Sequence, residues 1–75
     1  MITIVYYSEV IDNYGRTESS AQPQYIYNAL MNVDDWTDDI VFEDMHRNKY
    51  FIDELIGKEV NVPGIGIFTV PNDNN

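Results

Sequence analysis

The first eighteen residues combine one apolar run with a strong turn signal. Residues 2–7 are Ile, Thr, Ile, Val, Tyr and Tyr, which favour strands, and both alternating faces of the run are apolar. We therefore expect a central strand there. Residues 12–15, Asp-Asn-Tyr-Gly, have the chemistry of a tight turn, so the chain should return as a hairpin through Arg16 to Glu18.

The next segment has the apolar spacing of a helix. Apolar side chains recur at intervals of three and four residues, at Tyr25, Ile26, Ala29, Leu30 and Val33. Ser19 or Ser20 is the expected N-cap, and Pro23 fits the first turn, where its missing N–H costs little. The helix should end between residues 32 and 35.

Residues 34–44 allow two interpretations. Thr37 could cap a helix over residues 37–45, with Asp38 and Asp39 facing the positive end of its dipole. The apolar run Ile40-Val41-Phe42 would equally suit a short strand. Both interpretations stay open.

The last third contains a second helical pattern followed by strands. Residues 49–56 predict a short helix stopped by Gly57, with Tyr50, Phe51, Leu55 and Ile56 facing inward. Val60 and Val62 alternate with polar residues, Pro63-Gly64 suits a turn, and residues 65–70 predict another strand.

We expect an α+β fold in one compact domain over residues 1–70. A small antiparallel sheet from the N- and C-terminal strands would carry two or three short helices between them, and residues 71–75 would form a disordered tail.

Composition and charge narrow the class of protein. The 75 residues include 13 Asp and Glu against 4 Lys and Arg, for a net charge of −9, yet 44% are hydrophobic and 13% aromatic. That apolar content favours a folded domain over a disordered acidic tail. Without cysteine, disulfides and thiolate metal sites are excluded. No apolar stretch is long enough for a membrane span, and no basic region opens a signal peptide, so we expect a soluble cytoplasmic protein.

Signals for catalysis and for cofactor or metal binding are weak. The single histidine, His46, lies between Met45 and Arg47, close to Asp44, as a solvated surface histidine would. No serine lies in a nucleophile elbow, and Gly64-Ile65-Gly66 lacks the lysine and helix start of a phosphate loop. Adjacent acid pairs without a central glycine do not match an EF-hand calcium loop. We expect no catalytic residue, no cofactor and no dedicated metal site.

The acidic stretch 34–44 is the strongest signal in the chain, with six carboxylates among eleven residues and no basic residue. The predicted partner-binding residues are these acids, the two acids that open the next helix, and the tryptophan among them: Asp34, Asp35, Trp36, Asp38, Asp39, Glu43, Asp44, Asp53 and Glu54.

Crowded like charges destabilise a small domain unless a partner compensates them. If residues 37–45 form a helix, Asp39 and Glu43 lie on one face, about 6 Å apart along the axis. Phosphates of duplex DNA advance about 3.4 Å per nucleotide on each strand, so a row of carboxylates could occupy phosphate sites on a DNA-binding protein. A basic groove would relieve the repulsion and steer association.

In length, charge, lack of cysteine and the acid–aromatic stretch 34–44, the chain resembles the small acidic DNA-mimic inhibitors of bacteriophages. That class includes anti-restriction and anti-CRISPR proteins, inhibitors of uracil-DNA glycosylase and inhibitors of the DNA polymerase sliding clamp. The resemblance implies a phage-encoded inhibitor that binds a host DNA-binding protein. The best candidate for this protein is the sliding clamp, whose loading onto DNA the inhibitor would block. The linear clamp-binding peptide Gln-Leu-x-Leu-Phe is absent; residues 22–27 share only a glutamine and apolar positions with it.

Two alternatives stay open. The protein could be an anti-CRISPR or anti-restriction inhibitor, with a nuclease effector as its partner. It could also be an interaction module that binds through a sheet edge or through Tyr6, Tyr7 and Tyr14, while the acids only confer solubility. Neither an enzymatic activity nor direct binding to nucleic acid is expected, and a homodimer is compatible with each alternative.

Overall fold

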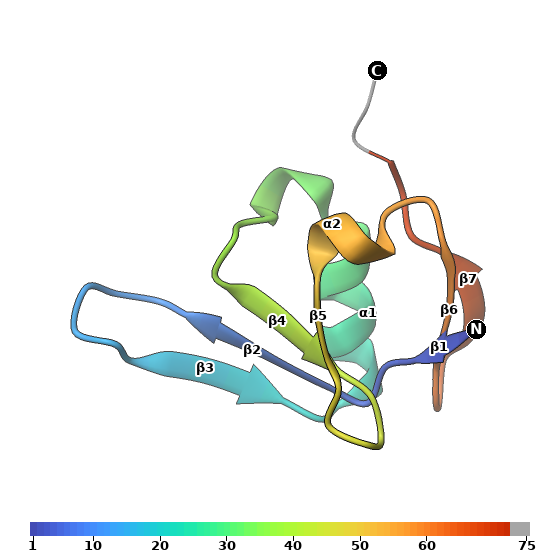
Figure 1. Ribbon diagram of the computed structural model, residues 1–75, viewed down its shortest axis with the longest axis horizontal. Helices are drawn as coiled ribbons and strands as arrows, with labels where there is room; N and C mark the ends of the chain where they lie inside the picture. Colours follow the sequence, from blue (N-terminus) through green and yellow to red (C-terminus); the bar gives the residue numbers. More distant parts are fainter. Residues whose placement is uncertain (73–75) are drawn as a thin grey trace.

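The computed structural model describes residues 1–72, which form two small β-sheets and two helices (Figure 1). In chain order the elements are β1 (Ile2–Thr3), β2 (Tyr6–Val10), β3 (Thr17–Ser20), α1 (Pro23–Met31), the 3-10 turn η1 (Val33–Asp35), β4 (Ile40–Glu43), β5 (Lys49–Phe51), α2 (Ile52–Leu55), β6 (Glu59–Val62) and β7 (Gly66–Thr69). The α+β class expected from the sequence is confirmed.

The strands divide into a four-stranded and a three-stranded sheet. The four-stranded sheet has the order β3-β2-β4-β5 and is antiparallel throughout. The other has the order β1-β6-β7, with β1 parallel to β6 and β7 antiparallel to β6. The expected single antiparallel sheet from the two ends of the chain is therefore not what forms.

The apolar run at the N-terminus joins the two sheets instead of forming one strand. The backbone N–H of Ile4 donates to the Asn61 carbonyl at 2.9 Å, and that of Val5 donates to the Glu43 carbonyl at 2.9 Å. Consecutive residues thus bond to different sheets. Ile4 is completely buried at this crossing, which explains why both faces of the run are apolar.

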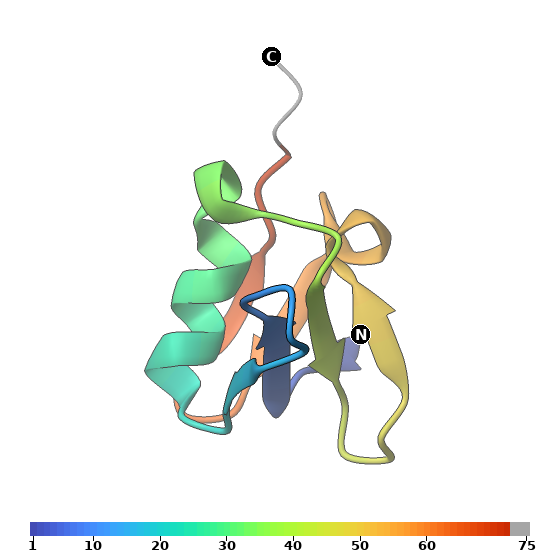
Figure 2. The same ribbon diagram turned by 90° about the vertical axis from the view of Figure 1, so that its left-hand side faces the viewer.

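The core lies where α1 packs against the sheets, along one side of the four-stranded sheet (Figure 2). Helix α1 contributes Ile26 and Leu30 from its inner face. The buried apolar residues are Ile4, Ile26, Leu30, Ile40, Phe42, Ile52, Leu55, Val60, Val62 and Val70. Burial of these side chains from every part of the chain is the main stabilising contribution to the fold.

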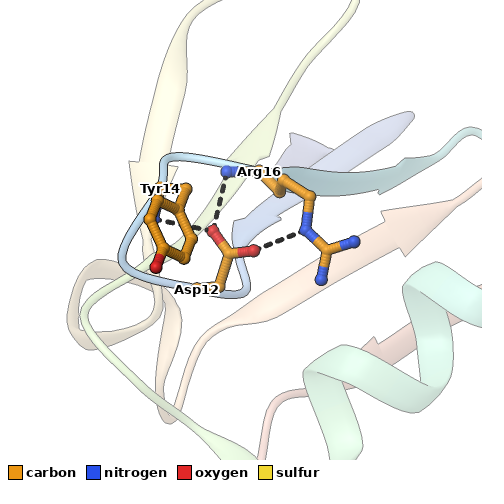
Figure 3. A network of polar contacts seen from close by, with 3 residues as sticks. All are labelled: Asp12, Tyr14 and Arg16. Carbon is orange, nitrogen blue, oxygen red and sulfur yellow. Dashed lines mark hydrogen bonds and ion pairs between the residues drawn. The ribbon is translucent and has the colours of Figure 1, made fainter.

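The expected hairpin between β2 and β3 is confirmed, and Asp12 organises its turn (Figure 3). One Asp12 carboxylate oxygen accepts the backbone N–H groups of Tyr14, at 2.9 Å, and Arg16, at 3.1 Å. The other oxygen accepts the Arg16 guanidinium. Gly15 has a φ of 82°, the left-handed conformation that favours glycine. In Figure 1 the hairpin projects from one end of the molecule.

Helix α1 is confirmed, but its cap differs from the expectation. Pro23 occupies the first turn as expected, and Gln22 is the N-cap. Ser20 belongs to β3, and its hydroxyl oxygen accepts the backbone N–H of Gln22 at 3.0 Å. Ser19 and Ser20 are therefore taken up by pairing with β2, which keeps them outside the helix start.

The helical interpretation of residues 37–45 is wrong, because Ile40–Glu43 forms β4 between β2 and β5. The Thr37 hydroxyl oxygen does accept the backbone N–H of Asp39, at 3.2 Å, but it closes a turn that leads into this strand. Pairing on both sides gives Ile40 and Phe42 buried positions on one face of the sheet. These long-range contacts decide between two local conformations that the sequence left open.

The second expected helix is shorter than predicted. Residues Lys49–Phe51 form β5, and α2 contains only Ile52–Leu55. Phe51 was expected to face inward but is 46% exposed, while Ile52 takes the buried position. Gly57 ends the segment with a φ of 74°, as expected.

The C-terminal hairpin of β6 and β7 is confirmed, with its turn at Pro63 and Gly64. Pro71 and Asn72 follow outside regular secondary structure, while residues 73–75 of the expected tail lie outside the described residues. None of the helices formed by residues 1–72 has the length and apolar character needed to cross a bilayer.

Candidate partner-binding surface

Acidic side chains remain at the surface and mostly lack cationic partners. No charged or polar residue is among the buried positions of the described chain. Within residues 1–72 one ion pair forms, between Arg16 and Asp12. The excess of 13 acidic over 4 basic residues is therefore left largely uncompensated by the protein itself.

The segment after α1 is held against the helix by two side-chain hydrogen bonds. The Asn32 amide donates to the Asp35 carboxylate at 2.6 Å, which fixes η1 at the helix end. The indole N–H of Trp36 donates to the Ala29 carbonyl at 3.1 Å, and its ring packs on the core. Trp36 therefore positions the acids on either side of it.

A surface hollow brings two of the predicted acids together. Trp36, Ile52 and Ile56 supply its apolar lining, and Asp38 and Asp53 flank them together with Thr37, around a volume of about 260 Å³. Asp38 lies in the turn before β4 and Asp53 in the first turn of α2. Both residues are exposed, and neither carboxylate accepts a hydrogen bond within the described residues. We call this site the Trp36 hollow.

The Asp44 carboxylate, in contrast, accepts hydrogen bonds within the turn between β4 and β5 and from β5. It accepts the backbone N–H groups of His46, at 2.8 Å, and Asn48, at 3.0 Å, and also the Asn48 amide, at 2.9 Å. The Tyr50 hydroxyl donates to it as well, at 3.0 Å. These bonds, the Asn48 amide first, lower the pKa of Asp44 to about 2, and the same carboxylate raises the pKa of Tyr50.

Glu54 and Glu43 also have places in the fold. The Glu54 carboxylate accepts the backbone N–H of Phe51 at 2.8 Å and so caps α2. Glu43 ends β4 opposite Tyr6 on one side and Lys49 on the other. With Asp44 it borders a different hollow, of about 570 Å³, beside Arg47.

The helical row of carboxylates does not exist. Asp39 precedes β4 and Glu43 ends it, so the two positions are about 13 Å apart along an extended strand, twice the helical spacing. Asp34 lies exposed in η1, and Asp35 lines a hollow that includes Glu9. The predicted residues therefore belong to several surface environments, of which the Trp36 hollow joins Trp36, Asp38 and Asp53.

Two acidic residues outside the predicted set also face each other. Glu9 on β2 lies directly opposite Glu18 on β3. The sequence carried a signal for this pair, because both residues are equally distant from the centre of the Asp12–Gly15 turn. Directly opposed like charges destabilise a strand pair.

A scan against protein-family models and searches of curated proteins and of solved structures find no match for this chain. Among the described residues, no three acidic or histidine side chains are grouped closely enough to hold a metal ion. The case for a function therefore depends on the surface itself.

Proposed function

We propose that the protein is an acidic inhibitor of the DNA-mimic kind, which binds the basic DNA-binding surface of a DNA-processing protein. The observation that carries the proposal is the charge: −9 on 75 residues, with one ion pair within the part of the chain that the structure describes. Such a surface attracts a basic groove over a distance of about a Debye length and accelerates encounter with it.

The Trp36 hollow supplies the anchor of this interaction. Tryptophan is among the residues that contribute most when an interface buries them, and flanking carboxylates would bond lysine or arginine side chains around it. The carboxylates of Asp38 and Asp53 accept no hydrogen bond within the described chain, so they lose no fold-stabilising bond when they pair with a partner. Asp34 and Asp39, both exposed, extend the negative surface along the same segment.

The finer assignment is a phage-encoded inhibitor of the sliding clamp in the host cytoplasm. A clamp offers a ring lined with basic residues, to which an acidic surface is complementary. Nuclease effectors, the targets of anti-CRISPR and anti-restriction proteins, have equally basic channels. The experiment below therefore identifies the partner without assuming which it is.

A second candidate is an interaction module that uses the open face of the four-stranded sheet. Tyr6 and Val41 are half-buried on the face opposite to Phe42, and Phe51 beside Val41 is 46% exposed. A partner bound on this face would contact aromatic and aliphatic side chains, and its affinity would not depend on the salt concentration.

The test is affinity capture from a bacterial lysate, followed by purification of the captured protein and competition with duplex DNA. We expect a basic DNA-binding protein that is captured at low salt, released at high salt and displaced by DNA. The double variant Asp38→Asn/Asp53→Asn should lose it, whereas Glu59→Gln, exposed on β6, should retain it. Capture that is unaffected by salt and by the double variant, yet lost in Phe51→Ser, would instead establish the second candidate.

A further inference from the structure

A groove runs between α1 and the β2–β3 hairpin, on the side of the sheet that faces the helix. It consists of two hollows, of about 540 Å³ and 190 Å³, and Tyr7 and Tyr25 line both of them. Tyr7 projects from β2 and Tyr25 from the first half of α1, so the two phenol rings mark the point where the hollows meet. We call this the tyrosine groove.

Each hollow carries acidic groups from a different element. Glu18 on β3 lines the larger hollow, and Glu9 on β2 and Asp35 in η1 line the smaller one. Glu9 follows Tyr7 by two residues, which puts both on one face of β2, and Glu18 shares that face because it pairs with Glu9. None of the residues that line either hollow is basic.

The charges in this groove act on one another. Burial raises the pKa of Tyr7, and the carboxylates of Glu18 and Glu9 and the phenol of Tyr25 raise it further. The Glu18 and Glu9 carboxylates that line the two hollows therefore act electrostatically on the Tyr7 hydroxyl. No cation of the protein's own relieves the opposition of Glu9 and Glu18, since the described ion pair joins Asp12 and Arg16 at the end of the hairpin.

We propose that the tyrosine groove binds an arginine side chain carried by an extended, basic segment of a protein partner. The guanidinium would lie between Tyr7 and Tyr25 and donate to the carboxylates of Glu9 and Glu18. Arginine fits because its planar guanidinium stacks on aromatic faces and presents five donors in a fixed arrangement. Asn28, which lines the smaller hollow, can bond the peptide backbone beside it.

This inference goes beyond the proposed function. The groove shares no lining residue with the Trp36 hollow, and it would recognise a flexible peptide segment, whereas a DNA mimic recognises a folded basic surface. Either site can therefore exist without the other. Neutralising Asp38 and Asp53 should leave peptide binding in the tyrosine groove unchanged.

The test uses a blocked peptide of glycines with two arginines, and matched peptides with two lysines or two citrullines. Citrulline keeps the shape of arginine and removes its charge. Binding is followed by two-dimensional NMR of the protein, with shifts expected at Tyr7, Glu9, Glu18 and Tyr25. The arginine peptide should bind at least about tenfold more tightly than the citrulline peptide, since hydrogen bonds between charged groups would be lost.

Variants connect the binding to the groove. Glu9→Gln and Glu18→Gln should each weaken arginine-peptide binding several-fold, and Tyr25→Ala, at an exposed position, should do the same without unfolding the protein. Far-UV circular dichroism verifies the fold of each variant, and Asp53→Asn serves as the matched control. Equal binding of the arginine and citrulline peptides, or shifts located at the Trp36 hollow instead, would overturn the proposal. Equal binding of the lysine peptide would also overturn it, because the groove would then attract charge without selecting arginine.

Discussion

The turn around Asp44 and the Trp36 hollow are both acidic, but they use their carboxylates in opposite ways. Asp44 accepts four hydrogen bonds from its own chain, so its carboxylate stabilises the β4–β5 connection. Asp38 and Asp53 accept none and lie beside an apolar lining. The same residue type, within one short stretch of sequence, thus serves folding in one place and is left available for a partner in the other.

The comparison teaches that the density of acids along a chain does not measure a binding surface. Asp12 repeats the role of Asp44 at the β2–β3 turn, and Glu54 caps α2. Substituting such residues would damage the fold and mimic a loss of binding. The informative substitutions are at carboxylates that the fold leaves unbonded.

Charge reversal at the Trp36 hollow should give the largest effect. We expect the double variant Asp38→Lys/Asp53→Lys to reduce affinity for the captured partner by about a hundredfold or more, because two attractive contacts become repulsive. Glu59→Lys, which reverses a single charge on β6, should lower the affinity only by the small amount expected from the change in net charge. Fluorescence of Trp36, the single tryptophan, offers a direct measurement at this hollow. An unchanged affinity in the double variant would remove the hollow from the binding surface.

Much of the fold follows from local signals in the sequence. The Asp12–Gly15 turn, the apolar face of α1 and the stop at Gly57 each depend on residues adjacent in the chain, and all three form as expected. The path of the N-terminal run and the choice of strand for Ile40–Glu43 depend on pairing with distant residues. A short apolar run has no means of indicating those partners, which is why the path of the N-terminal run was missed and the choice between helix and strand at residues 40–43 stayed open.

The candidate site was less predictable than the fold. The acids of residues 34–44 were visible, but the sequence did not distinguish Asp44 from Asp38. Asp44 accepts the backbone N–H groups of His46 and Asn48 in the β4–β5 turn, and the Asn48 and Tyr50 side chains also come within hydrogen-bonding distance of it. Likewise, Asp53 joins Asp38 only because α2 and the turn before β4 meet at Trp36. Sequence spacing carries neither contact.

The next largest effect should be the loss of stability on removing the Asp44 carboxylate. Asp44→Ala leaves two backbone N–H groups and two side-chain donors without their acceptor, so the midpoint of urea unfolding should fall clearly. Asp38→Ala removes no hydrogen bond of its side chain and should leave the midpoint nearly unchanged, or raise it slightly by relieving repulsion. Equal midpoints for the two variants would abolish the distinction between the two regions.

Replacing Trp36 by phenylalanine should have a smaller effect on stability. The change retains an aromatic ring but removes the donor that bonds the Ala29 carbonyl at 3.1 Å. We expect a loss of about 1 kcal/mol in the free energy of unfolding, the usual net value of one such bond. Denaturation followed by circular dichroism measures it, since the variant lacks tryptophan. A loss near zero would show that the hydrogen bond from Trp36 to the Ala29 carbonyl does not stabilise the fold.

The smallest effect concerns the titration of Asp44 itself. Its pKa is lowered from the ordinary 3.8 to about 2, so the charged form is favoured in the folded protein. The stabilisation is fully present above the unfolded pKa and is lost as the pH falls from about 4 towards 2. NMR titration of the carboxyl carbon should show this midpoint, and Tyr50→Phe, which removes one donor, should move it upward only part of the way, because the Asn48 and His46 bonds remain. A midpoint near 3.8 in the unsubstituted protein would mean that these bonds do not hold the carboxylate. Asp44 would then be as available to a partner as Asp38.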